Sequence, residues 1–311
     1  MNETNMQFLQ NTAVGTSIES ALRSAWLILR LIIPLYIMAD VLLYFDLLRH
    51  VTFLFAPVTR YLGLPPEAAM AIAGGVLLNL YAGIAFAAPL GLTPYQWTVL
   101  AVFLGVCHSM VVECAVMRRL GVSYLYSILL RGVMAFVVVV PVMYLPASFF
   151  AETVREGSAA LVHYDSVTSM LAGALVRACI LCGKIICLIT LIIFFMDWLK
   201  STRMMQAWGD RVNTSFSIIV GQLLGITYGA GILIREVDGG RLSRQDVFFI
   251  ATFLMICHSI IEDALLFVIF GASYWVIVGV RVGAALIFSF LLVRLFSTIL
   301  PMHLVVRDMK R

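Results

Sequence analysis

Long apolar stretches recur along almost the whole chain, and they constrain its fold more than any other feature. A helix needs about 20 mostly apolar residues to cross a membrane, and only helices or closed barrels satisfy their backbone groups there. Charged residues make up 12% of the 311 residues, whereas a soluble domain carries roughly 25%. The sequence therefore predicts an all-α polytopic membrane protein. Eight stretches are long enough to span the membrane: 22–45, 66–88, 94–118, 121–147, 170–198, 212–234, 245–269 and 273–299.

Polar segments flank these stretches. The polar N-terminus at 1–20 lacks a basic region followed by an apolar core, so we expect no cleaved signal peptide. Residues 50–63 are too short to span and contain Arg60, which predicts an interfacial or re-entrant helix. Residues 149–169 predict an amphipathic linker on the membrane surface, and 300–311 form a basic C-terminal tail. The net charge of +4 is spread over loop ends, so nothing indicates a nucleic-acid partner.

The linker separates two similar halves, 21–148 and 170–299. When 101–135 is aligned with the segment 150 residues later, 11 of the 35 positions are identical without a gap. Internal repeats of this size are common in transporters, with the site at the repeat interface. Four spans in each half is an even number, so the two copies should point the same way unless a short segment crosses. Lys and Arg occur in loops on both sides, so the positive-inside rule leaves orientation open.

Polar side chains are concentrated in the third apolar stretch of each half. The sequence reads CHSMVVEC at 107–114 and CHSIIEDA at 257–264. Ionisable groups at that depth are costly and usually face a protein interior or a watery cavity. Thiol, imidazole and carboxylate groups are good ligands for divalent transition metals. The candidate metal ligands are Cys107, His108, Cys257, His258 and Glu262.

Each of these stretches is followed by a glycine turn and a helix that carries an arginine. Glu113 lies eight residues before Gly121, and Arg131 lies ten residues after it. Asp263 and Arg281 repeat these distances around the second glycine turn. Acid and base therefore lie at nearly equal depth on neighbouring antiparallel helices. We predict two buried structural ion pairs, Glu113–Arg131 and Asp263–Arg281, because an unpaired buried charge is costly.

The second apolar stretch of each half contains glycines beside polar residues, as AGGVLLNLYAG at 73–83 and GQLLGITYGAG at 221–231. Glycine-interrupted segments at matching places in two repeats indicate a substrate site. Broken helices there expose backbone groups that can bind ions or polar solutes. The candidate substrate-binding residues are Asn79, Tyr81, Cys107, His108, Ser109, Thr227, Tyr228, Cys257, His258 and Ser259.

The two CHS motifs, each preceded by a glycine-rich helix, resemble the Gate or nucleoside-recognition domain family over roughly residues 20–300. That family includes the membrane portion of the bacterial ferrous-iron transporter and the spore-maturation proteins. The resemblance implies a multi-pass protein of the inner (plasma) membrane of a bacterium or archaeon, with two Gate units. It also implies transport, as a homo-oligomer or with a second Gate-family subunit. The family's copies are usually inverted, unlike those expected from eight spans, and this chain lacks the GTPase loop of the iron transporter.

These observations favour a permease that works by alternating access, with a central polar site between the two repeats. Its substrate would be a divalent transition metal or a small polar solute, and no resident cofactor is expected with certainty. One alternative is a transporter of a nucleoside-like organic solute, and another is a non-transporting membrane scaffold of the spore-maturation type. An enzyme is not expected, because no nucleophile–base–acid set and no H-E-x-x-H pattern is present. A single metal site requires the two imidazoles to lie within about 12 Å of each other.

Overall fold

The computed structural model describes residues 3–47, 49–150, 164, 166–201, 234, 237, 239 and 242–306. All extended regular elements in this part of the chain are helices. Most of the predicted linker, the predicted span at 212–234 and the candidate residues Thr227 and Tyr228 lie outside the described residues. Among the described residues, five helical segments are long and apolar enough to cross a membrane: Ser17–Tyr44, Pro94–Arg119, Tyr124–Met143, Val167–Trp198 and Tyr274–Thr298.

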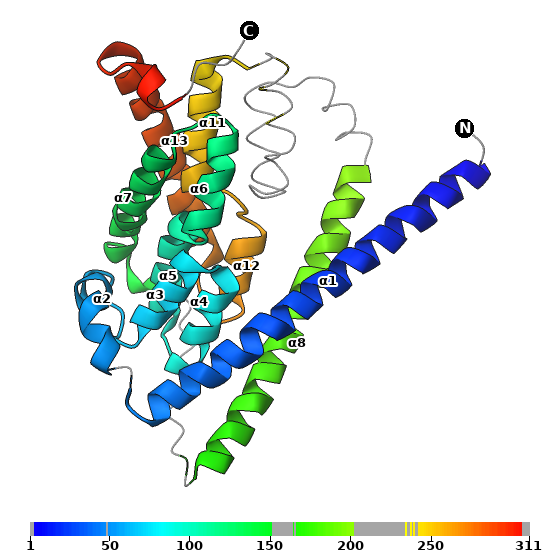
Figure 1. Ribbon diagram of the computed structural model, residues 1–311, viewed down its shortest axis with the longest axis vertical. Helices are drawn as coiled ribbons and strands as arrows, with labels where there is room; N and C mark the ends of the chain where they lie inside the picture. Colours follow the sequence, from blue (N-terminus) through cyan, green and yellow to red (C-terminus); the bar gives the residue numbers. More distant parts are fainter. Residues whose placement is uncertain are drawn as a thin grey trace.

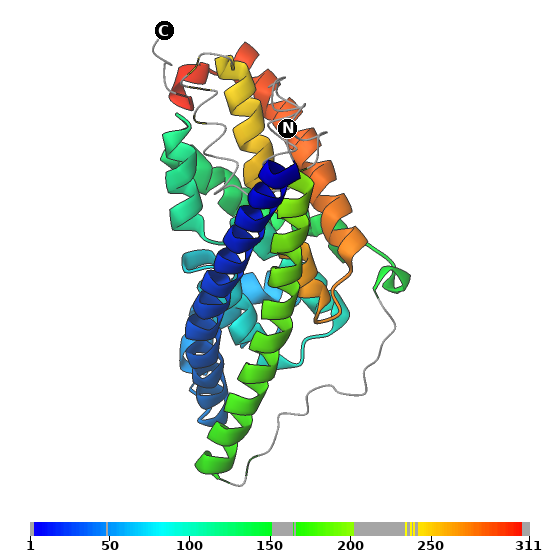
Figure 2. The same ribbon diagram turned by 90° about the vertical axis from the view of Figure 1, so that its right-hand side faces the viewer.

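The two longest of the described helices, α1 (Glu3–Tyr44) and α8 (Val167–Ser201), lie against each other in opposite directions (Figures 1 and 2). Near one end of the pair, the Ser17 hydroxyl donates to Asp197 Oδ2 over 2.6 Å. Towards the other end, Arg177 Nη2 donates to Asp40 Oδ2 over 2.6 Å. An early residue of α1 therefore meets a late residue of α8, and the reverse, which fixes the antiparallel arrangement.

The segment predicted to span at 66–88 is instead a hairpin of two short helices, α3 (Ala68–Leu77) and α4 (Leu80–Ala87). A Cβ atom added to Gly83 would lie 3.1 Å from both the Ala71 carbonyl oxygen and Gly75 Cα, so the helices fold back on each other. The two ends of the hairpin also meet, because Gln96 Nε2 donates to the Gly63 carbonyl over 3.4 Å. Helices of ten and eight residues reach only about 15 Å and 12 Å. The prediction of a full crossing at 66–88 is therefore wrong.

The break between α3 and α4 is built from the polar residue that the sequence singled out. Asn79 has an extended backbone and begins α4 as its N-cap residue. Its side-chain oxygen accepts from the Ala82 N–H over 3.0 Å, which satisfies one of the free donors at a helix start. Before the hairpin, α2 (Arg49–Tyr61) is a helix of 13 residues, in keeping with the short interfacial or re-entrant helix predicted there.

Two further segments that read as continuous spans are interrupted near their middle. The first consists of α5 (Pro94–Cys107) and α6 (Met110–Arg119), and the second of α11 (Arg244–Ile256) and α12 (Glu262–Val268). Within the breaks, Ser109 and Ser259 both have a φ of 47°, in the left-handed region. That conformation costs a residue with a Cβ atom roughly 1–2 kcal/mol. The surrounding structure therefore imposes these breaks, and the residue types alone do not reveal them.

The two interrupted segments run in opposite directions (Figure 1). At the start of α5, the ring of Trp97 stacks on Phe270, just beyond the end of α12, with centroids 4.3 Å apart. At the other end, Leu120 follows α6 and lines one small cavity together with Leu242 and Val247, around the start of α11. Each segment thus begins where the other ends. An even number of spans in each half would make the two halves parallel. Because the 66–88 hairpin does not cross, this expectation does not hold, and the two interrupted segments are antiparallel.

The remaining long helices enclose this pair. In α5 every side chain from Trp97 to Cys107 is buried, so this helix forms the centre of the molecule. The helices α7 (Tyr124–Met143) and α13 (Tyr274–Thr298) follow the two glycine turns, where Gly121 and Gly271 have φ values of 88° and 95°. Both helices bring one fully buried arginine towards the two breaks, Arg131 and Arg281.

Candidate metal site at two helix breaks

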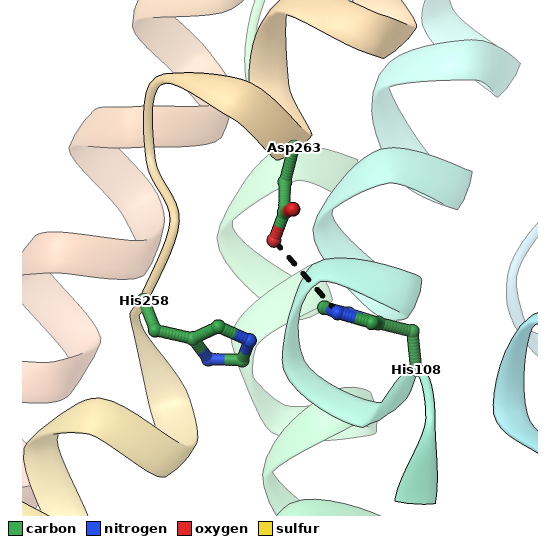
Figure 3. Close-up of side chains that lie close together, drawn as sticks. All are labelled: His108, His258 and Asp263. Carbon is green, nitrogen blue, oxygen red and sulfur yellow. Dashed lines mark ion pairs between the residues drawn. The ribbon is translucent and has the colours of Figure 1, made fainter. Parts of the chain in front are cut away.

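His108 and His258 directly precede the two left-handed serines, so both imidazoles leave the chain at a helix break. They point towards each other from the two antiparallel segments (Figure 3). Their ring centroids are 5.2 Å apart, well within the limit of about 12 Å for one shared ion. His108 is 6% exposed and His258 is 2% exposed. The two copies of the CHS motif therefore meet in one buried place.

The protein backbone fixes which ring nitrogen each histidine leaves available. In both residues Nδ1 lies 2.8 Å from the carbonyl oxygen four positions earlier, that of Leu104 or Leu254. A carbonyl can only accept, so each Nδ1 carries the proton and donates it. In a neutral imidazole Nε2 then bears the lone pair. Metal-binding histidines are held in the same way, by a hydrogen bond from the other ring nitrogen.

Carboxylates from the first turns of α6 and α12 face these Nε2 atoms. Glu113 Oε1 lies 3.0 Å from His108 Nε2, and Glu113 Oε2 lies 3.3 Å from His258 Nε2. Asp263 Oδ2 lies 4.0 Å from His108 Nε2 (Figure 3). A lone pair and a carboxylate oxygen repel each other at these distances unless a cation lies between them. The site is therefore arranged for a bound cation, either a proton or a metal ion.

The structure contains the first of the two predicted ion pairs. Arg131 Nη2 lies 2.7 Å from Glu113 Oε2, and both side chains are buried. The same guanidinium donates to the Val106 carbonyl over 2.7 Å and to the His108 carbonyl over 2.8 Å. These two carbonyls belong to the end of α5, where backbone acceptors are left without a helical partner. Arg131 therefore holds both the helix break and the orientation of Glu113.

The second predicted pair is absent: in the described part of the chain, no ion pair joins Asp263 to Arg281. Arg281 Nη2 instead donates to the carbonyls of Gly105, over 2.6 Å, and His258, over 3.0 Å. The aspartate is one methylene shorter than the glutamate at the equivalent position of the first motif, so its carboxylate does not reach the arginine. Asp263 Oδ2 is buried and makes no hydrogen bond. A buried carboxylate in this state is costly, and a bound cation would offset that cost.

Three residues thus form a group suited to one ion. His108, His258 and Asp263 each offer one ligand atom, and these atoms lie within 4.8 Å of one another. Two imidazole nitrogens and a carboxylate oxygen suit borderline divalent metals such as zinc or ferrous iron. Glu113, whose oxygens lie close to both Nε2 atoms, is positioned to act as a fourth ligand or to balance the charge.

Comparison with known proteins gives one informative relative. The chain is 30% identical over 295 residues to the uncharacterized membrane protein YvoD of Bacillus subtilis (strain 168), and the match covers 91% of this chain and 92% of that protein. The chain belongs to the YvoD family. No family model matches the chain, and no solved structure matches it. Together with the five candidate spans, the relationship identifies the chain as an all-helical polytopic membrane protein.

In this YvoD-family protein the two cysteines do not join the metal-binding group, contrary to the prediction. The Cys107 thiol donates to the Phe103 carbonyl over 3.2 Å and so points back along α5. Neither sulfur belongs to the group of close ligand atoms formed by His108, His258 and Asp263. Cys257 has an extended backbone. Because successive side chains of an extended chain point to opposite sides, its thiol is directed away when His258 enters the site.

Other predicted site residues have structural partners. Glu262 lies outside the group of ligand atoms, and its Oε1 accepts from the Tyr81 hydroxyl over 3.2 Å. The Ser109 N–H donates to the Gly75 carbonyl over 2.9 Å, which ties the α3–α4 hairpin to the first helix break. Asn79 serves as the N-cap of α4. Ser259 provides the left-handed turn of the second break.

Gly105 is a residue of this site that the sequence reading missed. A Cβ atom added there would lie 2.8 Å from Arg281 Cζ, so only glycine leaves room for the guanidinium. Its carbonyl also accepts from that arginine. The available signal was a lone glycine two residues before the CH pair, in a chain with a buried arginine that needs space and acceptors.

Proposed function

We propose that this YvoD-family protein is a cation transporter of the Gate type that carries a divalent transition metal, bound between His108 and His258. One observation carries the proposal. Two imidazoles from antiparallel interrupted helices meet in a buried site, each with Nδ1 engaged by a carbonyl and Nε2 directed at carboxylates. Interrupted helices that meet at the centre of two repeats are a common way to build a transport site in a membrane.

The paired geometry supports a relationship between two inverted copies. Both serines have a φ of 47°, and both arginines donate to the carbonyl of the histidine 23 residues earlier. With the α3–α4 hairpin re-entrant, the first copy crosses the membrane three times, through α1, α5–α6 and α7. An odd number of crossings inverts the second copy, formed by α8, α11–α12 and α13. Inverted copies are also what the Gate resemblance implies.

The distances in the site fit an ion better than a larger solute. Ligand atoms about 2.1 Å from a tetrahedral metal lie about 3.4 Å from each other. The contacts of 3.0 and 3.3 Å from Glu113 to the two imidazoles are close to that value. Asp263 Oδ2, at 4.0 Å from His108 Nε2, would reach it with only a small movement of the side chain. The residues expected to bind an organic solute, Asn79 and Tyr81, are already engaged within the protein. These contacts favour a metal over a nucleoside-like solute.

Transport can be measured in proteoliposomes that contain a metal-sensitive dye, with zinc, ferrous iron and manganese supplied outside. We expect the wild-type protein to accelerate entry of at least one of these ions. His108→Ala and His258→Ala should each abolish the acceleration, because either change removes a ligand. Cys107→Ala is the matched control and should retain it, since that thiol points away from the site. If metal enters liposomes with the wild-type protein no faster than it enters protein-free liposomes, the protein is not a transporter of these metals. The result would then favour the alternative of a membrane scaffold.

A further inference from the structure

The helix ends of the molecule form two opposite faces (Figure 1). On one face lie the turn between α6 and α7, the start of α11 and the end of α13. The contact between Ser123 N–H and the Val305 carbonyl, at 2.7 Å, joins the first and last of these. On the other face lie α2, the start of α5, the end of α7 and the start of α8. We call these the C-terminal face and the α2 face.

Basic residues are unequally divided between these two faces. The described parts of the α2-face connections, within 45–67, 88–93, 144–150 and 269–273, contain two arginines and two acidic residues. The arginines are Arg49 and Arg60, and the acidic residues are Asp46 and Glu67. At the C-terminal face, the described residues around the α6–α7 turn, the start of α11 and the end of α13 contain four arginines and one acidic residue, Asp246. These arginines are Arg118, Arg119, Arg244 and Arg294.

The chain after α13 returns to the α6–α7 turn. Val306 pairs with Val122 there in an isolated β-bridge. The described residues that follow α13 therefore lie on the C-terminal face.

From this division we infer that the C-terminal face lies in the cytoplasm, against the anionic headgroups of the inner leaflet. Lys and Arg in short connections set the orientation of membrane proteins, and acidic residues contribute little. Basic residues near an anionic membrane surface are attracted to its headgroups. Arg118, Arg119 and Arg294 are exposed, so their charges are available to headgroups. In this orientation the α3–α4 hairpin enters the membrane from the extracytoplasmic side.

The inference depends on the re-entrant hairpin. If 66–88 crossed the membrane, the connections before and after it would lie on opposite sides, and the basic residues would be mixed. The hydrogen bond between Gln96 and the Gly63 carbonyl shows instead that these connections share one side. The asymmetry of charge therefore becomes visible only when the fold is known. It is independent of any metal bound at the histidines.

Orientation can be tested with two single-cysteine variants of the full chain, one for each face. Tyr144 is 84% exposed on the α2 face, and Leu304 is 60% exposed on the C-terminal face. Tyr144→Cys and Leu304→Cys would be made in a background with Cys179→Ser and Cys187→Ser, which removes the exposed native thiols. A membrane-impermeant maleimide is then applied to spheroplasts and to inverted membrane vesicles.

We expect Tyr144→Cys to be labelled in spheroplasts and Leu304→Cys only in inverted vesicles. A C-terminal green fluorescent protein fusion on the otherwise unchanged chain should be fluorescent, because that fluorophore matures in the cytoplasm, and it reports even if a cysteine variant folds poorly. The reverse labelling pattern would overturn the inference. Labelling of both variants in spheroplasts, or a dark fusion with normal expression, would overturn it as well.

Discussion

At the scale of single residues, the length of one side chain distinguishes the two halves of the site. Glu113 reaches Arg131 and forms an ion pair with it at 2.7 Å, whereas Asp263 is one methylene shorter and forms no ion pair with Arg281 in the described part of the chain. The first carboxylate therefore has a charged partner within the protein, while the buried Oδ2 of the second has none and depends on a bound cation. The repeated motif alone suggested two equal ion pairs, and the difference depends on a reach that only coordinates reveal.

Asp263→Glu tests this division of roles. The longer side chain should reach Arg281 and form the ion pair that the native protein lacks, which withdraws a carboxylate from the metal-binding group. We expect zinc affinity, measured by titration calorimetry in detergent, to fall at least about tenfold, as losses around metal ligands commonly do. The matched control, Glu262→Asp, should bind zinc with native affinity because Glu262 lies outside the group. Undiminished zinc affinity in Asp263→Glu would show that this carboxylate is not a ligand.

Arg131 should be among the residues most important for stability. Replacing it by methionine leaves Glu113 as a buried charge without its partner and removes the donors to two backbone carbonyls. Removing one member of a buried pair typically costs about 3–5 kcal/mol. We expect a clearly lower thermal unfolding temperature in detergent. Arg23→Met is the control: Arg23 forms an exposed pair with Glu19, and such pairs contribute less than about 1 kcal/mol. Similar losses in both variants would argue against this role.

At the scale of elements, the helix interruptions place the functional groups. The sequence correctly indicated where apolar helices occur and that polar chemistry gathers at positions 107–109 and 257–259. It gave no sign that the chain leaves the helix at the two serines, because their positive φ is imposed by contacts elsewhere. One such contact is the hydrogen bond from Ser109 N–H to the Gly75 carbonyl. The sequence could therefore identify the two histidines. It could not predict the direction of their side chains, or that the Cys107 thiol points away from the site.

The α3–α4 hairpin depends on close helix contact at Gly83. A methyl group there would lie 2.9 Å from Leu104 Cδ1 and 3.1 Å from the Ala71 carbonyl oxygen, which belongs to the backbone and cannot easily move. Gly83→Ala should therefore lower the unfolding temperature in detergent and weaken zinc binding, because the hairpin supports the first helix break. Gly132→Ala is the control, since a methyl group there meets nothing within 4 Å. If both variants unfold at the native temperature, the hairpin is not packed as described.

At the scale of the whole molecule, a single re-entrant segment determines how the two halves are related. The internal similarity at 150 residues was visible in the sequence, and so were most of the spans. Counting 66–88 as a crossing predicted parallel halves, because apolar composition does not distinguish a hairpin of two short helices from one straight helix. With that hairpin returning to its own side, the interrupted helices become antiparallel, and His108 and His258 face each other.

The central claim is that one metal ion binds between His108 and His258, with oxygen from a carboxylate and without cysteine sulfur. X-ray absorption spectroscopy of the purified protein loaded with one equivalent of zinc tests it most directly. The structure predicts two imidazole nitrogens at about 2.0–2.1 Å with carboxylate oxygen completing the shell, and the imidazole signal should decrease in His258→Ala. A zinc–sulfur distance of about 2.3 Å, or a shell without imidazole, would contradict the claim.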